Sequence, residues 1–477
     1  MMSTAEQIED LASALNTVWV LICTFLVFWE QAGFAMWEAG SLREKNVHNI
    51  LLKNLLDAAI GVVAFMTTGY AVAFGETAGG FLGKSGFFMT DMNDFLKHSY
   101  ANWFFQWAFA ATAATTVSGC MAERTRFESY LIYTFVITAF IYPVVVHWLW
   151  ADDGWLCAWG DNGAFGHGMI DFAGSAVVHM VGGVAGLVGS ILVGPRLGRF
   201  DKSVDQKLFA GHSVVLSTIG VYCLWFGWFG FNAGYTMTVT NGNFRIAALI
   251  CVNTVVSPAF AALTCLVYEK YFSGFYDLPN VLNAVVSGLV GITGPCGVVS
   301  PAGAVGIGIV SGLAYCVSIR VHAWLRIDDP VCAVAVHAWP GLWGAIAPGF
   351  FATSEQVKAL GYNAGAGLFY GGNASQLGVQ CLGSVTILAW TAAISGIVFF
   401  SLKLLGMLRV SSEEEEIGLD ISKHGVQRAV LDKKSSTSCK ETEQTSGSNE
   451  SEKSEEIESD EPEKNEETAQ NVALARA

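Results

Sequence analysis

Eleven apolar stretches, each close to the length of a membrane-spanning helix, run through the chain as far as Leu405. A helix needs about 20 apolar residues to cross the hydrocarbon core of a bilayer. Helices satisfy their own backbone hydrogen bonds there, so these stretches predict an all-α integral membrane protein. The predicted spans are Asn16–Gly40, Asn54–Phe74, Asn102–Cys120, Tyr130–Trp150, Asp171–Val193, His212–Tyr235, Ile246–Tyr268, Val281–Val299, Val305–Val321, Val331–Phe351 and Leu377–Leu405.

The composition agrees with helices that pack closely in a membrane. The chain has 52% hydrophobic and only 14% charged residues, with 52 glycines. Small residues allow membrane helices to approach each other closely. The 11 cysteines are scattered and form no Cys-x-x-Cys pair or His/Cys cluster, so we expect no metal, no cofactor and no disulfide framework. The N-terminus has no cleavable signal pattern, and we expect the first span to direct membrane insertion.

The basic residues predict the orientation of the spans. One alternating set of loops holds 12 Lys and Arg residues, whereas the other set holds 4. Cytoplasmic loops carry the excess of Lys and Arg, so the N-terminus is predicted outside and the C-terminus in the cytoplasm. We expect the membrane to be the plasma membrane. We divide the chain into an extracellular N-terminus (1–15), an eleven-helix domain (16–408), a cytoplasmic regulatory segment (409–430) and an acidic disordered tail (431–477). The net charge of −15 gives no reason to expect a nucleic-acid partner.

One pattern occurs twice, in the fifth and tenth spans. Asp171 precedes His179 by eight residues, and Asp329 precedes His337 by eight, with glycines four and seven residues after each histidine. The two spans run in opposite directions in the predicted topology. This predicts an inverted repeat of five plus five spans, with the functional site near the midplane where the repeats meet. The alternative is a chance recurrence in glycine-rich spans.

The two histidines are the first candidate site residues. Burial disfavours the imidazolium form, so we expect both rings to be neutral. A neutral ring has one donor and one acceptor nitrogen, which suits a small hydrogen-bonding solute or the relay of a proton. Two histidines without further ligands do not predict a metal site. The alternative is a pair of buried histidines that are satisfied by their neighbours.

Aromatic side chains and one acid are the second group of candidates. Aromatic clusters lie at or near the predicted outer ends of three spans, in Trp103–Phe109, His147–Trp150 and Trp225–Phe231. Such rings often form an interfacial belt. They also attract cations, by roughly 0.5 to 2 kcal/mol for each contact. Asp171 is expected to cap the free N–H groups at the start of its span.

Several stretches together resemble the ammonium transporter / methylammonium permease / Rhesus superfamily, on its ammonium transporter branch. The segment from Asp171 to His179 reads Asp-Phe-Ala-Gly-Ser-Ala-Val-Val-His and is similar to the signature of that family. The resemblance covers residues 12–430. Other similar stretches are Gln31–Asn46, Asn49–Asn54, Ala122–Arg124, Gly227–Gly234 and Val252–Val256.

The resemblance implies a homotrimer in the lipid bilayer, with eleven spans and one pore per subunit. It implies that ammonium or methylammonium is recruited outside, loses its water against aromatic rings and passes as ammonia, with or without a separately relayed proton. We expect no enzymatic activity, because the sequence has no metal cluster, nucleophile motif or phosphate loop. The matching residues are the pore histidines His179 and His337, the stacked rings Phe109 and Phe231, and the outer-site residues Phe105, Gln106, Trp150 and Asp171.

Two positions depart from the family pattern. Tyr235 replaces a usual serine at the outer site, and Cys332 replaces an acid that often lies five residues before the second histidine. Two alternatives to transport share the pore residues: a sensor that signals through the tail, and a Rhesus-like channel for NH3 or CO2. A potassium channel is not indicated, because the Thr-Val-Gly-Tyr-Gly filter is absent from the sequence.

Two candidate modification sites lie outside the pore pattern. Ser422 lies where some relatives carry a phosphorylatable hydroxyl, in a segment that resembles the cytoplasmic coupling segment of the family. A phosphate there adds about −1.5 to −2 charge and is expected to undock the segment. Asn373 begins an Asn-Ala-Ser sequon in a predicted outer loop and is a candidate for N-glycosylation.

Overall fold

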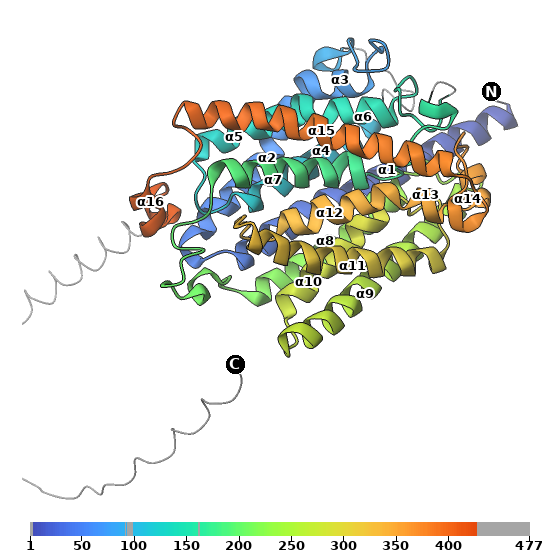
Figure 1. Ribbon diagram of the computed structural model, residues 1–477. Coiled ribbons are helices and arrows are strands. Elements are labelled where there is room, and N and C mark those ends of the chain that lie inside the picture. The colour runs from blue at the N-terminus through green and yellow to red at the C-terminus, as the bar shows by residue number, and fades with distance from the viewer. Residues whose placement is uncertain (1–2, 91, 93–98, 161–162, 427–477) are drawn as a thin grey trace, which may run out of the picture. The chain divides into compact units, whose positions relative to one another are not determined.

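The computed structural model describes residues 3–90, 92, 99–160 and 163–426, and the predicted acidic tail (431–477) lies outside them. Within these residues every regular element is a helix, and the extended segments form only isolated β-bridges. Figure 1 shows long helices that lie side by side along a common direction. The predicted all-α fold is therefore confirmed.

Each of the eleven predicted spans coincides with a helix or with a run of abutting helices. Short π-helical turns join α2 to α3 and α5 to α6, and a third, η7 (Ser175–Met180), leads into α7. The helices are α1 (Thr4–Ser41), α2 (Val47–Ala64), α3 (Tyr70–Phe74), α4 (Tyr100–Cys120), α5 (Phe127–Val136), α6 (Tyr142–Trp150), α7 (Val181–Val193), α8 (Val214–Gly234), α9 (Asn243–Ser273), α10 (Leu278–Thr293), α11 (Pro301–Trp324), α12 (Ala333–Ile346), α13 (Pro348–Phe351), α14 (Ser354–Ala359), α15 (Ala374–Leu404), α16 (Ser412–Ile417) and α17 (Leu419–Ser422).

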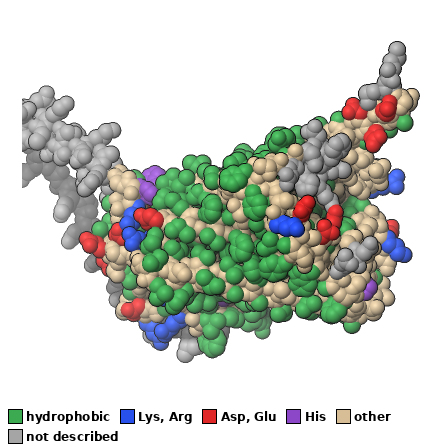
Figure 2. Space-filling view, turned by 90° about the horizontal axis from the view of Figure 1, so that it is seen from above, with side chains coloured by type: hydrophobic (Ala, Val, Ile, Leu, Met, Phe, Trp, Pro, Cys, Tyr) green, Lys and Arg blue, Asp and Glu red, His purple; other side chains and the backbone are tan. Residues whose placement is uncertain are grey.

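Eight of the described helices or helix runs are long and apolar enough to cross a membrane by themselves. The three other predicted spans correspond to α4, α10 and the pair α12–α13. Figure 2 shows a broad band of hydrophobic side chains on one face, with most charged side chains near the two ends of the molecule. Large apolar side chains such as Phe25, Tyr222 and Leu263 are more than half exposed. Such a surface is stable only against lipid or another apolar partner, as expected of a multi-pass membrane protein.

Local signals place some helix ends away from the predicted positions. The first helix begins at Thr4 rather than Asn16, because Ser3 and Glu6 form a reciprocal capping box at its start. The eighth span ends at Thr293 rather than Val299. Gly294 still has helical φ and ψ, and Pro295 explains the early end because proline has no backbone N–H to donate to the carbonyl four residues before it. The ninth helix begins at Pro301, after the cap residue Ser300.

The two Asp…His copies have matching local structure. Asp171 and Asp329 each lie four residues before the first helical residue, and each carboxylate accepts a backbone N–H of the following turn. The residue just before the helix has a positive φ in both copies, 111° at Gly174 and 62° at Cys332. This conformation suits glycine and is costly for cysteine. The helix pairs α1·α8 and α7·α12, which the repeat makes equivalent, pack against each other.

Glycines at the crossing of α7 and α12 bring the two histidine-bearing segments together. A Cβ atom at Gly183 would overlap the backbone nitrogen of Ala338, next to His337. A Cβ atom at Gly341 would lie 2.8 Å from the carbonyl oxygen of Ser175 and 3.0 Å from the nitrogen of Met180, next to His179. The glycines that follow each histidine by four residues therefore permit the close backbone approach.

An ion cluster is buried at the end of the bundle where α1 ends. Arg196 Nη1 lies 2.8 Å from Glu123 Oε2, and Arg196 Nε lies 2.8 Å from Asp328 Oδ2, with all three side chains at most 3% exposed. Burial by itself raises the pKa of the Glu123 carboxyl. The Arg196 and Arg43 guanidiniums outweigh burial and hold that pKa below its usual range. The cluster therefore joins three loops by charged groups that remain ionised.

The segment after the last long helix packs on the same end of the bundle. Asp420 accepts hydrogen bonds from the backbone nitrogens of His48 and Asn49, at 3.0 and 2.9 Å. Lys45 Nζ donates to the carbonyl oxygens of Glu415 and Glu416 at 2.9 and 2.6 Å. These contacts hold α16 and α17 against the start of α2.

Candidate functional site

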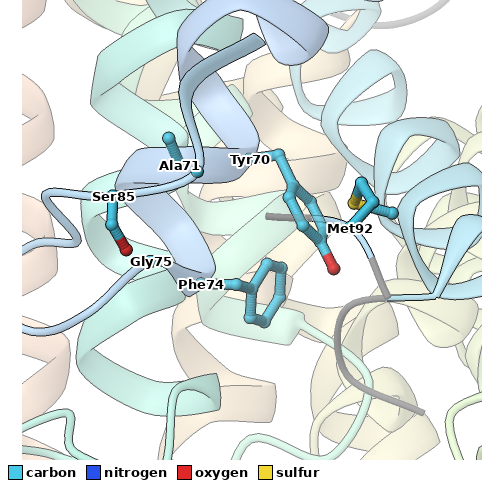
Figure 3. A pocket seen from close by; sticks show the side chains of 7 residues that line it. Tyr70, Ala71, Phe74, Gly75, Ser85 and Met92 are labelled. Carbon is cyan, nitrogen blue, oxygen red and sulfur yellow. The ribbon is translucent and has the colours of Figure 1, made fainter. Parts of the chain in front are cut away.

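A cavity of about 640 Å³ opens at the end of the bundle opposite the ion cluster, and we call it the aromatic vestibule. Its lining includes Gln106, Trp150, Phe172, Tyr235 and Met237. A separate pocket beside it, of about 20 Å³, lies between the rings of Tyr70 and Phe74 and the side chain of Met92 (Figure 3). That pocket has room for about one water molecule, so the vestibule is the better candidate for a solute site.

Aromatic rings and one amide form the inner wall of the vestibule. The rings of Trp150 and Tyr235 lie 4.5 Å apart between centroids, and Gln106 Nε2 donates to the Tyr235 hydroxyl at 3.4 Å. Phe105 lies 5.9 Å from the Tyr235 ring. Tyr235 follows the last residue of α8, so its phenol group occupies the position where the family resemblance implies a smaller hydroxyl.

Two stacked rings separate the vestibule from the interior. Phe109 of α4 and Phe231 of α8 lie 4.0 Å apart between centroids, and both side chains are fully buried. Phe109 also lies 6.2 Å from Trp150. The spacing leaves no gap between the two rings.

The two histidines lie directly behind this ring pair. The His179 ring lies 5.4 Å from Phe231 and 5.3 Å from the His337 ring, and the two Nδ1 atoms are 3.3 Å apart. Both histidines are fully buried. The Nε2 atom of each ring has no hydrogen-bond partner among the described residues. Two unpartnered ring nitrogens therefore remain for a small donor or acceptor beside the rings.

Asp171 makes hydrogen bonds to η7 and to Trp150, and none to the histidines. Its Oδ2 atom accepts from the nitrogens of Ala176 and Val177, both at 2.9 Å, and its carbonyl oxygen accepts from Trp150 Nε1 at 2.8 Å. The carboxylate thereby fixes the start of η7, and the backbone carbonyl of the same residue holds the indole of Trp150. Asp171 thus lies next to Trp150 of the aromatic wall.

A second cavity, of about 310 Å³, lies on the far side of the histidines and is called the opposite vestibule below. Its lining includes Trp37, Ser217, Asn283 and Cys332. Trp37 lies 6.3 Å from the His337 ring. The aromatic vestibule, the ring pair, the histidines and the opposite vestibule therefore follow one another through the bundle.

The structure brings nine of the predicted site residues together and leaves two apart. The nine are Phe105, Gln106, Phe109, Trp150, Asp171, His179, Phe231, Tyr235 and His337. Ser422 closes α17, where its hydroxyl donates to the Gly418 carbonyl oxygen at 2.8 Å. Asn373 caps α15 and is exposed, so its position is open to modification.

Sequence reasoning placed Trp228 only in an aromatic cluster near the outer end of its span, and it did not single out Phe34 and Trp37. Trp228 stacks on His179 with 5.0 Å between centroids, and Phe34 and Trp37 lie 6.2 and 6.3 Å from His337. The sequence signal for these residues was the spacing of aromatic pairs along a helix. Trp228 precedes Phe231 by three residues, and Phe34 precedes Trp37 by three, so each pair shares a helix face.

The arrangement suits the passage of a small polar molecule better than the binding of a metal. Among the described residues, no three His, Cys, Asp or Glu side chains are placed to hold a metal ion. The path is narrow, apolar and fully buried around the histidines. A charged solute is expensive at such a position, whereas a neutral one with a hydrogen-bonding group is not.

Comparisons with known proteins agree with this geometry. Residues 18–429 match the model of the Ammonium Transporter Family. The chain is 41% identical to Ammonium transporter 3 of Dictyostelium discoideum over 421 residues, which cover 88% of this chain and 95% of that protein. It is 42% identical to Ammonium transporter 1 member 1 of Arabidopsis thaliana over 400 residues, which cover 81% of this chain and 80% of the other.

Two solved structures have the same fold. One is described as a Sensor Amt Protein, with a TM-score of 0.77 and 32% identity, and the match covers 87% of this chain and 99% of that one. The other is Mep2 of Candida albicans, with a TM-score of 0.76 and 26% identity, where the match covers 84% and 87%.

Proposed function

The chain belongs to the Ammonium Transporter Family and transports ammonium across a membrane, and we propose that it does so along the path from the aromatic to the opposite vestibule. In this mechanism ammonium binds among Trp150, Tyr235 and Gln106. It then loses a proton, and ammonia passes the ring pair and the two histidines.

One observation carries this proposal: two buried histidines, each with an unpartnered Nε2, lie directly behind a closed pair of rings. A buried polar atom without a partner is costly, and a passing ammonia molecule satisfies it. The neutral imidazole offers a donor or an acceptor to that molecule. A bare inorganic cation gains neither contact, so the site favours ammonia over sodium or potassium.

The cost of charge explains why the proton is separated from the solute. Moving a charge to the bilayer centre costs about 2.5 to 17 kcal/mol, depending on how far water and lipid adapt. Deprotonation at the aromatic vestibule avoids that cost. The imidazole pair, whose Nδ1 atoms lie 3.3 Å apart, gives the proton a separate route, so the net result is transport of ammonium.

We expect His337→Ala to remove charge movement while leaving the fold intact. The substitution deletes one member of the contact between His337 Nδ1 and His179 Nδ1 and breaks the proposed proton route. The expected loss of ammonium-evoked current is at least about 100-fold, the scale of positioned proton transfer. The current is measured from purified protein in liposomes on a solid-supported membrane.

A dye inside the same liposomes reports whether ammonia still equilibrates. Sustained current in wild type that collapses in His337→Ala supports the mechanism. Absence of current in wild type with rapid ammonia equilibration means a neutral ammonia channel. Absence of both signals in correctly assembled wild type contradicts transport and favours a sensor.

Assembly and orientation complete the proposal. We propose a homotrimer in the plasma membrane, with one path per subunit, the N-terminus outside and the 409–430 segment in the cytoplasm. The excess of Lys and Arg in the loops near the ion cluster supports this orientation. Native mass spectrometry of the purified protein is expected to give three times the 51.1 kDa chain mass, and a monomer would contradict the trimer.

We propose that the 409–430 segment is regulatory and that phosphorylation of Ser422 releases it. The Ser422 hydroxyl donates to the Gly418 carbonyl within α17, and Asp420 of the same helix holds the start of α2. A negative group at position 422 lies close to Asp420 and Glu414, so repulsion loosens the docking. Ser422→Asp is expected to lower ammonium transport several-fold in the liposome assay. Wild-type transport by this variant, with Ser422→Ala as control, would exclude the proposal.

A further inference from the structure

Glu30 is a buried acid in the middle of α1 that the mechanism above does not use. Its side chain is 0% exposed, and neither carboxyl oxygen has a hydrogen-bond partner among the described residues. An ionisable residue within a membrane span is costly, and such residues mark the routes of ions and protons. Glu38, two turns further along α1, differs because its oxygens accept hydrogen bonds from Asn54 and Ser118. Glu38 therefore has a structural role, whereas no hydrogen-bond partner among the described residues accounts for the burial of Glu30.

Glu30 lies on the face of α1 that points to the solute path. Residues four and seven positions further along a helix share a face, and here they are Phe34 and Trp37. Both rings lie within 6.3 Å of the His337 ring. Seven residues before Glu30 is Cys23, whose Sγ atom lies 3.2 Å from the place of a Cβ at Gly234, beside Phe105. The acid is therefore located between the aromatic wall and the histidines.

The facing helix leaves room for the carboxyl group. A Cβ atom at Gly227 of α8 would overlap Glu30 Cγ and lie 3.1 Å from Oε1. The next residue, Trp228, stacks on His179. Because Gly227 has no side chain, Glu30 can lie against α8, the helix that carries Trp228. The packed helices α1 and α8 therefore carry both Glu30 and the rings that contact the two histidines.

Few other titratable groups face this part of α1. The ring of His337, on α12, lies beside Phe34 and Trp37 of α1, and the ring of His179, on η7, stacks on Trp228 of α8. On α8, Cys223 lies one turn from Gly227. Cys120 of α4 and the α2 residues Lys53 and Asp57 lie near Glu38, at the other end of this part of α1. Among the described residues, none of these groups is hydrogen-bonded to the Glu30 carboxyl.

We propose that Glu30 exchanges a proton with the transported ammonium, as a third protonatable residue of the path beside the two histidines. In the forward step an N–H bond of ammonium breaks and an O–H bond forms on the Glu30 carboxylate, which leaves ammonia and a neutral carboxylic acid. The reverse step with ammonia forms ammonium and restores the carboxylate. Both steps conserve charge and atoms. This inference rests on the proposed ammonium transport.

The test compares Glu30→Gln with wild type in liposomes. Glutamine has the same shape and cannot titrate. The ammonium-evoked current is recorded from pH 5.5 to 8.5, together with ammonia equilibration reported by an internal pH dye. Glu30→Gln is expected to lose at least about tenfold in current and to lose its pH dependence, while ammonia equilibration stays within about twofold. Thr24→Val is the matched control, because Thr24 is equally buried on α1 and donates only to the Val20 carbonyl oxygen.

Each outcome decides the proposal. A Glu30→Gln current with the wild-type size and pH profile overturns it. Glu30→Met, which removes the polar group, serves if Glu30→Gln fails to assemble: selective loss of current supports the proposal, and wild-type current overturns it. Loss of both signals in both variants assigns Glu30 a structural role and also overturns it. Wild-type protein that moves no ammonium is a different result, because it contradicts the proposed function itself.

Discussion

Replacing Arg196 by Met is expected to lower the free energy of unfolding by about 3 to 5 kcal/mol, because it leaves two buried carboxylates without their common partner. Arg196 contacts Glu123 at 2.8 Å and Asp328 at 2.8 and 3.0 Å, and its side chain is only 3% exposed. Titration of the detergent-solubilised protein with a denaturing detergent, followed by circular dichroism, gives the change.

Arg199 supplies the matched control for this prediction. It lies 3.5 Å from Asp328, but its side chain is 32% exposed to solvent. Exposed ion pairs contribute about 0 to 1 kcal/mol, so Arg199→Met is expected to have a small effect. Equal losses in the two variants would show that the buried cluster does not hold this end of the bundle together.

Replacing Gly183 by Ala is expected to reduce ammonium flux about 100-fold, because a displacement of about 1 Å at a reacting centre has effects of that size. The added methyl group would overlap the backbone nitrogen of Ala338 and lie 2.7 Å from its Cα atom. The backbone of α12 has no freedom to move away by a rotamer change. The helix therefore shifts and takes His337 away from His179. Flux is measured in liposomes with the internal pH dye.

Gly396 of α15 is the control for a glycine-to-alanine change in a membrane helix. A Cβ atom there meets only Val188 Cγ1, at 4.0 Å, which is an ordinary contact. Gly396→Ala is expected to keep wild-type flux and to gain about 0.5 to 1 kcal/mol of stability from helix propensity. Wild-type flux in Gly183→Ala would mean that the glycine contact does not set the distance between the histidines.

Much of the fold was accessible from the sequence because membrane helices obey a length rule. The eleven apolar stretches fall on helices, and the Asp…His pattern gave the equivalence of the fifth and tenth spans. The helix ends were less accessible. Thr4 and Thr293 are set by a capping box and by Pro295, and a hydropathy pattern does not register either signal.

The candidate site was accessible only in part. The spacing of Asp171, His179, Asp329 and His337 predicted two histidines at the same depth. The pairing of Phe109 with Phe231 came from the family resemblance, because contact between α4 and α8 depends on packing and leaves no pattern in either helix. Glu30 was different, since it and Glu38 were visible in the sequence as the two acids of the first apolar stretch. Its importance appeared only when the structure gave it no partner.

The matched caps at Asp171 and Asp329 bear on the direction of flow. Each histidine follows its cap by eight residues, and the two segments run in opposite directions, so the capped segments themselves present the same groups from either side. Any rectification must then arise outside the repeat. The aromatic vestibule and the opposite vestibule differ in volume and in lining, and rectification is therefore a property of the entrances rather than of the centre.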